Sequence, residues 1–408
     1  VVGRCVVRQD DGVKRTLLVV LLASAVAVAA CSSDDEGAAA PDTTIEATSS
    51  TATPATTEAP PTTAAPATTA APATTAAPAA TDAPATTAAP PVTVGDWTSI
   101  PGGDECRCSD GSPYELWERP ADPTRVVLYL QGGGACFDEL TCSPTLEVFN
   151  RDLQLGRAPD SAGIFDSTAP ENPLATHSIV YVPYCTGDVH LGANVAQYGD
   201  VTIQHNGFAN ASKGLDTVVA NYPDLEQLVV VGISAGSVAA PAFAGLAADA
   251  FPDAQIVSFG DSSGAYPDVP ELNVEIGGTW GVLNNVPDWP VNEGLEPADW
   301  SFPGLTVQSG TQHPDITFAR FDFSADGVQA ILLALAGVPA ADLGENIEQT
   351  EAQIEAAGVD VASFVAPGAE HTILRNSAFY ELEVGGVRLV DFVTALVAGD
   401  VPADVRPI

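Results

Sequence analysis

The chain has 408 residues, and 14 Lys and Arg residues stand against 53 Asp and Glu residues, which gives a formal net charge of -39 at pH 7. Because phosphate binding needs a basic face, this balance argues against a nucleic-acid-binding protein and against attachment to an anionic membrane through protein charge. Residues 38 to 91 consist mainly of Pro, Ala and Thr with repeated A-A-P-A-T-T units, and such a segment cannot bury a core. We therefore expect a disordered linker over residues 32–91 and one globular domain over residues 92–408.

The first 31 residues are typical of a secretory signal. Lys14 and Arg15 precede an apolar stretch that is shorter than the ~20 residues needed to span a bilayer. The following Val28-Ala29-Ala30-Cys31 resembles a bacterial lipobox, which implies cleavage before Cys31 and attachment of a lipid to it. An uncleaved N-terminal anchor is the alternative. Both predict a domain outside the cytoplasm, with the linker as a spacer and the N-terminal anchor as its only contact with the membrane.

Apolar segments alternate with helical patterns through the globular part. A hairpin is expected to start at residues 116–118, and helices are expected at about 209–221, 235–250 and 387–398. This alternation predicts an α/β fold with a mostly parallel sheet covered by helices on both faces, in which ligands bind at the carboxyl ends of the strands. The segments expected to be strands are residues 125–130, 178–182, 227–231, 255–259, 316–321 and 361–365.

The pentapeptide Gly232-Ile233-Ser234-Ala235-Gly236 follows the strand at 227–231 and opens the Ala-rich segment that runs to about residue 250. A G-x-S-x-G sequence between a strand and a helix is typical of a nucleophile elbow, which exposes the serine hydroxyl above the sheet. A Gly/Ser turn without chemistry is the alternative. A nucleophilic serine needs a base, a carboxylate to orient that base, and donors for the oxyanion.

His371 is the expected base. It follows the last predicted strand, and in hydrolases with this alternating pattern the order along the chain is Ser, then acid, then His. His190 also follows a strand end, but it precedes the serine, so lining a pocket or capping a turn is the alternative for it. No role is assigned to the remaining histidines, which are His177, His205 and His313.

The expected acid is Asp322, at the end of the penultimate predicted strand, with Asp326 as the second choice. Asp326 also suits the N-cap of a helix starting at Gly327. The glycine loop at 132–134 follows the first predicted strand and matches loops that donate backbone N–H groups to an oxyanion. Gly133, Gly134 and Ala235 are the expected oxyanion donors.

Several motifs occur in order along the globular part. They are C-S-D-G-S-P-Y at 108–114, Q-G-G-G-A-C-F-D-E-L-T-C at 131–142, E-N-P at 171–173, V-Y-V-P-Y-C-T-G-D-V-H at 180–190, G-I-S-A-G at 232–236, F-D at 321–322 and E-H at 370–371. These motifs together resemble the pectin acetylesterase/Notum family. The resemblance implies an α/β-hydrolase fold and carboxylic ester hydrolysis by Ser234, Asp322 and His371; it favours Asp322 over Asp326 and supports the same oxyanion donors. The chain departs from the family pattern at Ala135, where the family usually has Trp, and at Ser237, where it usually has Gly.

Cysteine usage fits an oxidising compartment. The C-x5-C pattern shared with the family implies a disulfide between Cys136 and Cys142, and Cys185 is expected to pair with either Cys106 or Cys108. A metal site at the C-x-C sequence lacks a matching His/Cys cluster, so no metal site is expected. No cofactor is expected either.

A Pro/Gly/Asn-rich stretch between residues 265 and 312 contains three tryptophans, Trp280, Trp289 and Trp300. Because it follows the strand after the elbow, it is expected to lie over the pocket. Local packing on the domain is the favoured role, and a lid or a sugar-stacking wall is the alternative. Residues 345–357 are expected to form an acidic surface helix without chemistry.

The combined hypothesis is a monomeric bacterial cell-surface lipoprotein, an extracellular serine carboxylesterase that removes O-acetyl or other small acyl groups from a polysaccharide. One alternative is a lipid or fatty-acyl esterase of the Notum type. The other is a catalytically silent glycan-binding surface module.

Overall fold

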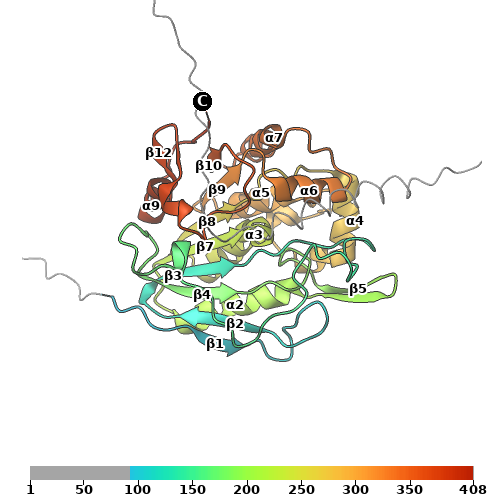
Figure 1. The fold of residues 1–408 in the computed structure, drawn as a ribbon, viewed down its shortest axis with the longest axis horizontal. Helices are drawn as coiled ribbons and strands as arrows, with labels where there is room; N and C mark the ends of the chain where they lie inside the picture. The colour runs from blue at the N-terminus through green and yellow to red at the C-terminus, as the bar shows by residue number, and fades with distance from the viewer. Residues whose placement is uncertain (1–91, 408) are drawn as a thin grey trace, which may run out of the picture. The chain divides into compact units, whose positions relative to one another are not determined.

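The computed structural model describes residues 92–407, and its centre is an eight-stranded sheet in the order β1-β2-β4-β3-β7-β8-β9-β10. Figure 1 shows the strands in this order from β1 to β10. The six strands from β4 to β10 are parallel, and β1 and β2 extend the sheet in antiparallel pairs. The predicted α/β fold is confirmed. The strands are β1 (Thr98–Pro101), β2 (Glu115–Arg119), β3 (Asp122–Leu130), β4 (His177–Val182), β7 (Gln227–Ile233), β8 (Gln255–Asp261), β9 (Thr317–Phe323) and β10 (Val361–Ala366).

Helices and two small ribbons complete the domain. The expected closing helix begins only at Leu389, because the preceding Val387–Arg388 pairs with Glu383–Val384 across the Gly385-Gly386 turn. The helices are α2 (Gly207–Asn221), α3 (Ala235–Ala250), α4 (Pro270–Trp280), α5 (Phe302–Gln312), α6 (Gly327–Leu335), α7 (Leu343–Ala356), α8 (Ala378–Glu381) and α9 (Leu389–Ala398). The ribbons are β5 (Asn194–Tyr198) with β6 (Val201–His205), and β11 (Glu383–Val384) with β12 (Val387–Arg388).

The sheet has an apolar core on each face. Side chains alternate along a strand, so in β7 Leu228 and Val230 join the core beneath α2 and α3, while Val229 and Val231 join the core beneath α9. All residues of β4, β7 and β10 are buried, as expected for parallel strands covered on both sides. Full burial of each such Val or Leu side chain contributes roughly 1.5–3 kcal/mol. The carboxyl ends of the strands are therefore held on a rigid base.

Two disulfides tie the segments that follow β1, β3 and β4. Cys136 is bonded to Cys142, as predicted, and Cys108 is bonded to Cys185, which settles the alternative left open by the sequence. Cys106 is buried and makes no disulfide within the described residues.

The predictions for the N-terminal part lie outside the described residues. These are the signal over residues 1–31, lipidation of Cys31 and the linker over residues 32–91. Within residues 92–407, none of the helices has the length and apolar character required to cross a bilayer.

The two disulfides close loops of very different length, so their removal is predicted to cost different amounts. The sequence separations are 77 residues for Cys108–Cys185 and 6 residues for Cys136–Cys142. Loop-closure entropy predicts a loss of about 4 kcal/mol for the double variant Cys108→Ala/Cys185→Ala and about 2 kcal/mol for Cys136→Ala/Cys142→Ala. Urea unfolding of both variants measures this. Equal losses would contradict the entropic explanation.

Candidate active site

Ser234 occupies the sharp turn between β7 and α3. Its φ of +49° is in the left-handed region, which is strained for a residue with a side chain. A Cβ at Gly236 would lie 2.0 Å from the Leu130 backbone oxygen, and one at Gly232 would lie 2.1 Å from the Gly236 oxygen. Only glycine therefore fits at either side of the serine. The predicted strand–elbow–helix arrangement is present.

A continuous chain of hydrogen bonds joins three side chains at this turn. His371 Nε2 lies 2.8 Å from Ser234 Oγ, and His371 Nδ1 lies 2.7 Å from Asp326 Oδ2. Asp326 is fully buried, whereas the His371 ring is 18% exposed. The structure thus brings together the predicted serine, the predicted histidine and the aspartate that was the second choice.

Asp322 does not contact His371, so its predicted position as the acid is wrong in this structure. Strand β9 runs two residues further than expected, to Phe323, and places Asp322 inside the sheet. There its Oδ1 accepts hydrogen bonds from the Gly264 N–H and from Gln329 Nε2, and burial raises the pKa of its carboxyl group. Asp326 lies in the loop beyond the strand, where it can reach His371.

Asp326 combines the two roles that the sequence analysis treated as alternatives. Its Oδ1 accepts the backbone N–H groups of Val328 and Gln329 and so caps α6, while Oδ2 contacts His371. Gln329 Nε2 also lies 3.2 Å from Oδ2. The cap therefore fixes the carboxylate in the orientation that the histidine contact requires. The sequence correctly indicated that Asp326 caps a helix. It did not show that the second carboxylate oxygen of Asp326 would contact His371.

The glycine loop lies beside the serine. A Cβ at Gly132 would be 2.7 Å from Ser234 Cβ, and Gly134 has a φ of +76° with its Cβ position only 1.8 Å from the Val148 oxygen. Among the described residues, the N–H groups of Gly133 and Gly134 donate no hydrogen bond. Ala235 is the first residue of α3, where backbone N–H groups have no partner within the helix. All three predicted donors are thus available.

His190 supports the glycine loop and does not contact Ser234. Burial lowers its pKa to about 4, so the ring is neutral at pH 7, and Nε2 lies 2.8 Å from the Gln131 backbone oxygen. The three histidines without an assigned role make other contacts: His177 with Gln227, His205 with Tyr198, and His313 with Asp249.

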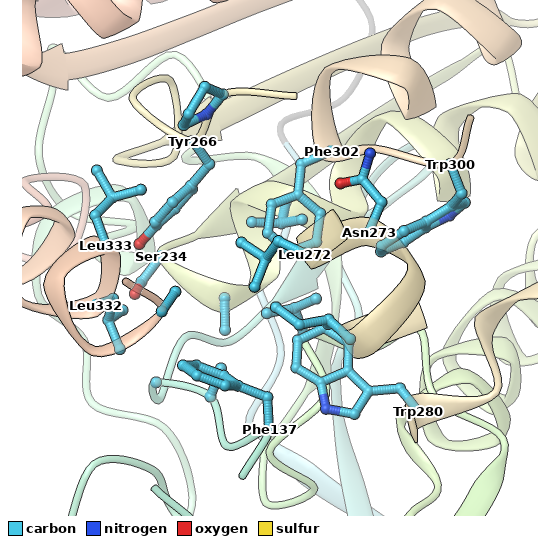
Figure 2. A pocket seen from close by; sticks show the side chains of 18 residues that line it. Phe137, Ser234, Tyr266, Leu272, Asn273, Trp280, Trp300, Phe302, Leu332 and Leu333 are labelled. Atoms are coloured by element: carbon cyan, nitrogen blue, oxygen red, sulfur yellow. The ribbon is translucent and has the colours of Figure 1, made fainter. Parts of the chain in front are cut away.

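An apolar pocket opens at Ser234, and its empty volume is about 750 Å³ with the open mouth included. Figure 2 shows Ser234 at one side of this pocket and the indole rings of Trp280 and Trp300 at the other. Its lining residues come from five parts of the chain: the glycine loop and its continuation, Val189 after β4, the elbow with the start of α3, the stretch from 266 to 302, and the end of α6. They include Ala135, Phe137, Val238, Tyr266, Leu272, Ile276, Trp280, Trp300, Phe302, Leu332 and Leu333.

The tryptophan-rich stretch both packs on the domain and forms a wall of the pocket. Trp280 and Trp300 are almost completely buried, and Trp280 Nε1 donates to the Cys136 oxygen. Trp289 is not among the residues that line the pocket at Ser234, and its Nε1 donates to Asp249. Local packing was the favoured prediction, and it holds for all three residues.

Asp261, at the end of β8, links the serine to the histidine loop and was not found from the sequence. Its backbone oxygen accepts the Ser234 N–H at 2.7 Å. Its carboxylate Oδ2 accepts the N–H groups of Ile373 and Leu374, each at 2.9 Å. Burial raises the pKa of this carboxyl group to about 6, against the opposing effect of these hydrogen bonds and of His371.

A group of three carboxylates, Glu351, Glu355 and Asp404, lies away from this site with ligand atoms within 4.8 Å of one another. Glu351 is paired with Arg320 and Arg406, and Asp404 accepts the Ser363 N–H. These contacts account for the cluster as part of the packing around β10.

The sheet order, the elbow and the position of His371 after the last strand define an α/β-hydrolase fold. Comparison with known proteins supports the family predicted from the sequence. Residues 96–278 match the family model "Pectinacetylesterase", in agreement with the resemblance of the sequence motifs to the pectin acetylesterase/Notum family.

Individual relatives match shorter parts of the chain. The chain is 30% identical to palmitoleoyl-protein carboxylesterase notum1a of Danio rerio over 142 residues. These residues make up 32% of this chain and 27% of the relative. It is 34% identical over 93 residues to human palmitoleoyl-protein carboxylesterase NOTUM, 21% of this chain and 18% of the relative. A third relative, inactive palmitoleoyl-protein carboxylesterase notum1b of Danio rerio, is 31% identical over 91 residues, 21% of this chain and 66% of the relative. The chain therefore matches less than a third of the length of the first two relatives.

The raised pKa of Asp261 predicts a pH-dependent contribution to stability. Because the folded pKa of about 6 exceeds the ordinary value of 3.8, the folded protein binds this proton more tightly, so the contribution is greatest at low pH and is lost as pH rises through 6. Asp261→Asn cannot titrate. The stability of the unsubstituted protein relative to this variant should therefore fall by about 2 kcal/mol between pH 4.5 and 7.5.

Urea unfolding of both proteins at several pH values measures this difference, and the other ionisable groups, present in both proteins, largely cancel. Parallel stability curves across this range would show that Asp261 has an ordinary pKa.

Proposed function

We propose that the protein is a serine carboxylesterase that acts through Ser234, His371 and Asp326. The observation that carries this proposal is the chain of hydrogen bonds from Asp326 through His371 to Ser234, at 2.7 and 2.8 Å. His371 Nε2 takes the proton from Ser234 Oγ as the oxygen attacks the ester carbonyl carbon, and Asp326 stabilises the imidazolium that forms.

The negative charge of the tetrahedral intermediate develops on the former carbonyl oxygen. The N–H groups of Gly133, Gly134 and Ala235 are the donors assigned to this oxygen, and the loss of one such donor typically costs ~3 kcal/mol of transition-state stabilisation. His371 then protonates the leaving alcohol, and water hydrolyses the acyl-enzyme by the same steps in reverse.

The apolar pocket supports an acyl group longer than acetyl. Its lining is dominated by aliphatic and aromatic side chains, which suit a hydrocarbon chain and offer few partners for a polar group. The relatives are named as carboxylesterases, active or inactive, for a palmitoleoyl group. We therefore place the fatty-acyl esterase, which was the alternative in the sequence analysis, first.

Removal of O-acetyl groups from a polysaccharide remains the second candidate. It is supported by the match of residues 96–278 to the pectinacetylesterase model. Action outside the cytoplasm, as a monomeric lipoprotein attached through Cys31, is proposed from the sequence of residues 1–31.

A catalytically silent surface module is the remaining alternative, and one relative does bear the description inactive. The contacts among Ser234, His371 and Asp326 count against it, since they leave the serine next to a base. Labelling of Ser234 by a fluorophosphonate probe tests this point, and an unlabelled folded protein would favour the silent module.

The assignment of the acid predicts different effects for the two neighbouring aspartates. Asp326→Asn should lower kcat on p-nitrophenyl esters by about 10³–10⁴, because the amide does not stabilise the imidazolium. Asp322→Asn is the matched control, and it should change kcat by less than about tenfold, since Asp322 does not contact His371. Ser234→Ala should abolish the activity. Steady-state kinetics of the three purified variants measure these effects.

If Asp322→Asn lowered kcat far more than Asp326→Asn, Asp322 would be the acid, as predicted from the sequence. Unchanged turnover in Ser234→Ala would overturn the proposed mechanism as a whole.

If the apolar pocket holds the acyl chain, the protein should prefer esters of longer acids to acetate esters, and one substitution in the pocket should reverse this preference. Leu332 on α6 lines the pocket, so Leu332→Trp should lower kcat/KM for p-nitrophenyl octanoate at least tenfold relative to the acetate ester, by filling the space of the chain. Leu335→Trp is the control, because Leu335 lies on the same helix, is also half-buried and is not among the residues that line the pocket. A wild-type preference for acetate that neither variant alters would favour the deacetylase.

A further inference from the structure

Tyr266 carries a hydroxyl group that the mechanism proposed above does not use. The residue follows β8 and lines the apolar pocket that opens at Ser234, and of the residues that line this pocket only these two carry a hydroxyl group. Figure 2 shows the phenol ring of Tyr266 directed toward Ser234, with Phe137 on the other side of the serine in this view. The ring packs edge-on against that of Phe302, with the ring centroids 5.9 Å apart. The phenol therefore faces the part of the pocket in which a bound ester would react.

The hydroxyl group of Tyr266 is available as a hydrogen-bond donor. Among the described residues, Tyr266 Oη makes no hydrogen bond. Burial raises the pKa of Tyr266 above its ordinary value, and the charges of Asp326 and Asp322 raise it further, so the phenol keeps its proton at neutral pH. A hydroxyl group left unpaired among apolar side chains costs free energy, which a hydrogen bond to a bound ligand would recover.

The backbone just before Tyr266 is held by side chains close to the acid of the triad. The Gly264 N–H donates to Asp322 Oδ1 at 2.8 Å, and the Ala265 N–H donates to Gln329 Oε1 at 3.0 Å. Asp322 and Gln329 are both completely buried, so these contacts are shielded from water. They fix the direction in which the Tyr266 side chain leaves the main chain.

Gln329 joins this segment to the base. Its Nε2 lies 3.2 Å from Asp326 Oδ2, and the same oxygen contacts His371. The phenol and the imidazole are thus anchored to one carboxylate, whereas the predicted oxyanion donors belong to the glycine loop and to the start of α3. In acyl transfer by a triad, the alcohol oxygen of the ester lies toward the base, which protonates it, and the carbonyl oxygen lies toward the oxyanion donors. Tyr266 therefore approaches the ester from the side of the alcohol oxygen.

We propose that Tyr266 is a further catalytic residue, whose Oη–H donates a hydrogen bond to the alcohol oxygen of the ester as that oxygen leaves. The inference rests on the proposed esterase function and adds a leaving-group donor to it. When the tetrahedral intermediate breaks down, the bond between the carbonyl carbon and the alcohol oxygen breaks, and the electron pair stays on that oxygen. The oxygen takes its proton from His371 Nε2. Tyr266 keeps its own proton and supplies only the hydrogen bond.

The experiment uses Tyr266→Phe, which removes the hydroxyl group and keeps the ring. It compares the p-nitrophenyl and ethyl esters of one acid, chosen as the acid whose p-nitrophenyl ester the unsubstituted protein cleaves fastest. p-Nitrophenolate is a weak base and leaves without assistance, whereas ethoxide is a strong base that needs a donor. kcat/KM should therefore fall about tenfold for the ethyl ester and less than about twofold for the p-nitrophenyl ester.

The matched control is Tyr129→Phe. Tyr129 is completely buried on β3, its hydroxyl group also has no hydrogen-bond partner among the described residues, and it does not line the pocket at Ser234. The control should leave the ratio of the two kcat/KM values unchanged. Rates are expressed per Ser234 labelled by a fluorophosphonate probe, so an unfolded fraction of a variant does not enter them. Tyr266→Leu, which removes the ring as well, should change the ratio in the same direction as Tyr266→Phe.

An equal fall for both esters in Tyr266→Phe, or no fall, would overturn the role of Tyr266 while the esterase function stands. If Ser234→Ala cleaves the p-nitrophenyl ester as fast as the unsubstituted protein, or if the unsubstituted protein cleaves neither ester, the proposed function itself fails. The two failures are therefore distinguishable.

Discussion

The end of strand β8 holds the reacting groups of this site together. The backbone oxygen of Asp261 fixes the N–H of Ser234, and its side chain fixes two N–H groups of the loop that carries His371. Ser262 adds to this link, because its hydroxyl donates to Asp261 Oδ1 and accepts the Thr372 N–H. These contacts help to set the 2.8 Å separation between the serine and the histidine, which are 137 residues apart in the chain.

Burial of the Asp261 carboxylate has an electrostatic cost. A fully buried carboxylate loses its hydration, and burial is the main reason that the pKa of Asp261 rises to about 6. The three hydrogen bonds to its oxygens offset part of that loss by stabilising the ionised form. The carboxylate of Asp326 is also buried and loses its hydration. Two N–H groups at the start of α6 and the His371 ring surround it instead. Both aspartates are held by backbone N–H groups, which for Asp326 lie at the start of α6 and for Asp261 lie in the loop between β10 and α8.

The sequence predicted the sheet, the serine elbow, His371 and the Cys136–Cys142 disulfide, because each depends on a local pattern or on a motif with fixed spacing. It misplaced the acid, because the choice between Asp322 and Asp326 depends on where β9 ends, and apolar periodicity does not fix a strand end to within two residues. Asp261 was missed for a different reason. Its role depends on contacts with residues more than 110 positions away, and no local pattern records them.

The difference between local sequence patterns and contacts between distant residues also explains why the family resemblance identifies the reaction class more firmly than the substrate. The matched region, residues 96–278, contains the glycine loop and Ser234, but it ends before Asp326, His371 and the α6 residues that line the pocket. Twelve of the eighteen residues that line the apolar pocket belong to the matched region, and six belong to the remainder of the chain. Ala135 lies in the matched region, at a position where a bulkier side chain would occupy this space. The identity of the acyl group thus depends on the packing between the two regions, because neither region encloses the pocket alone.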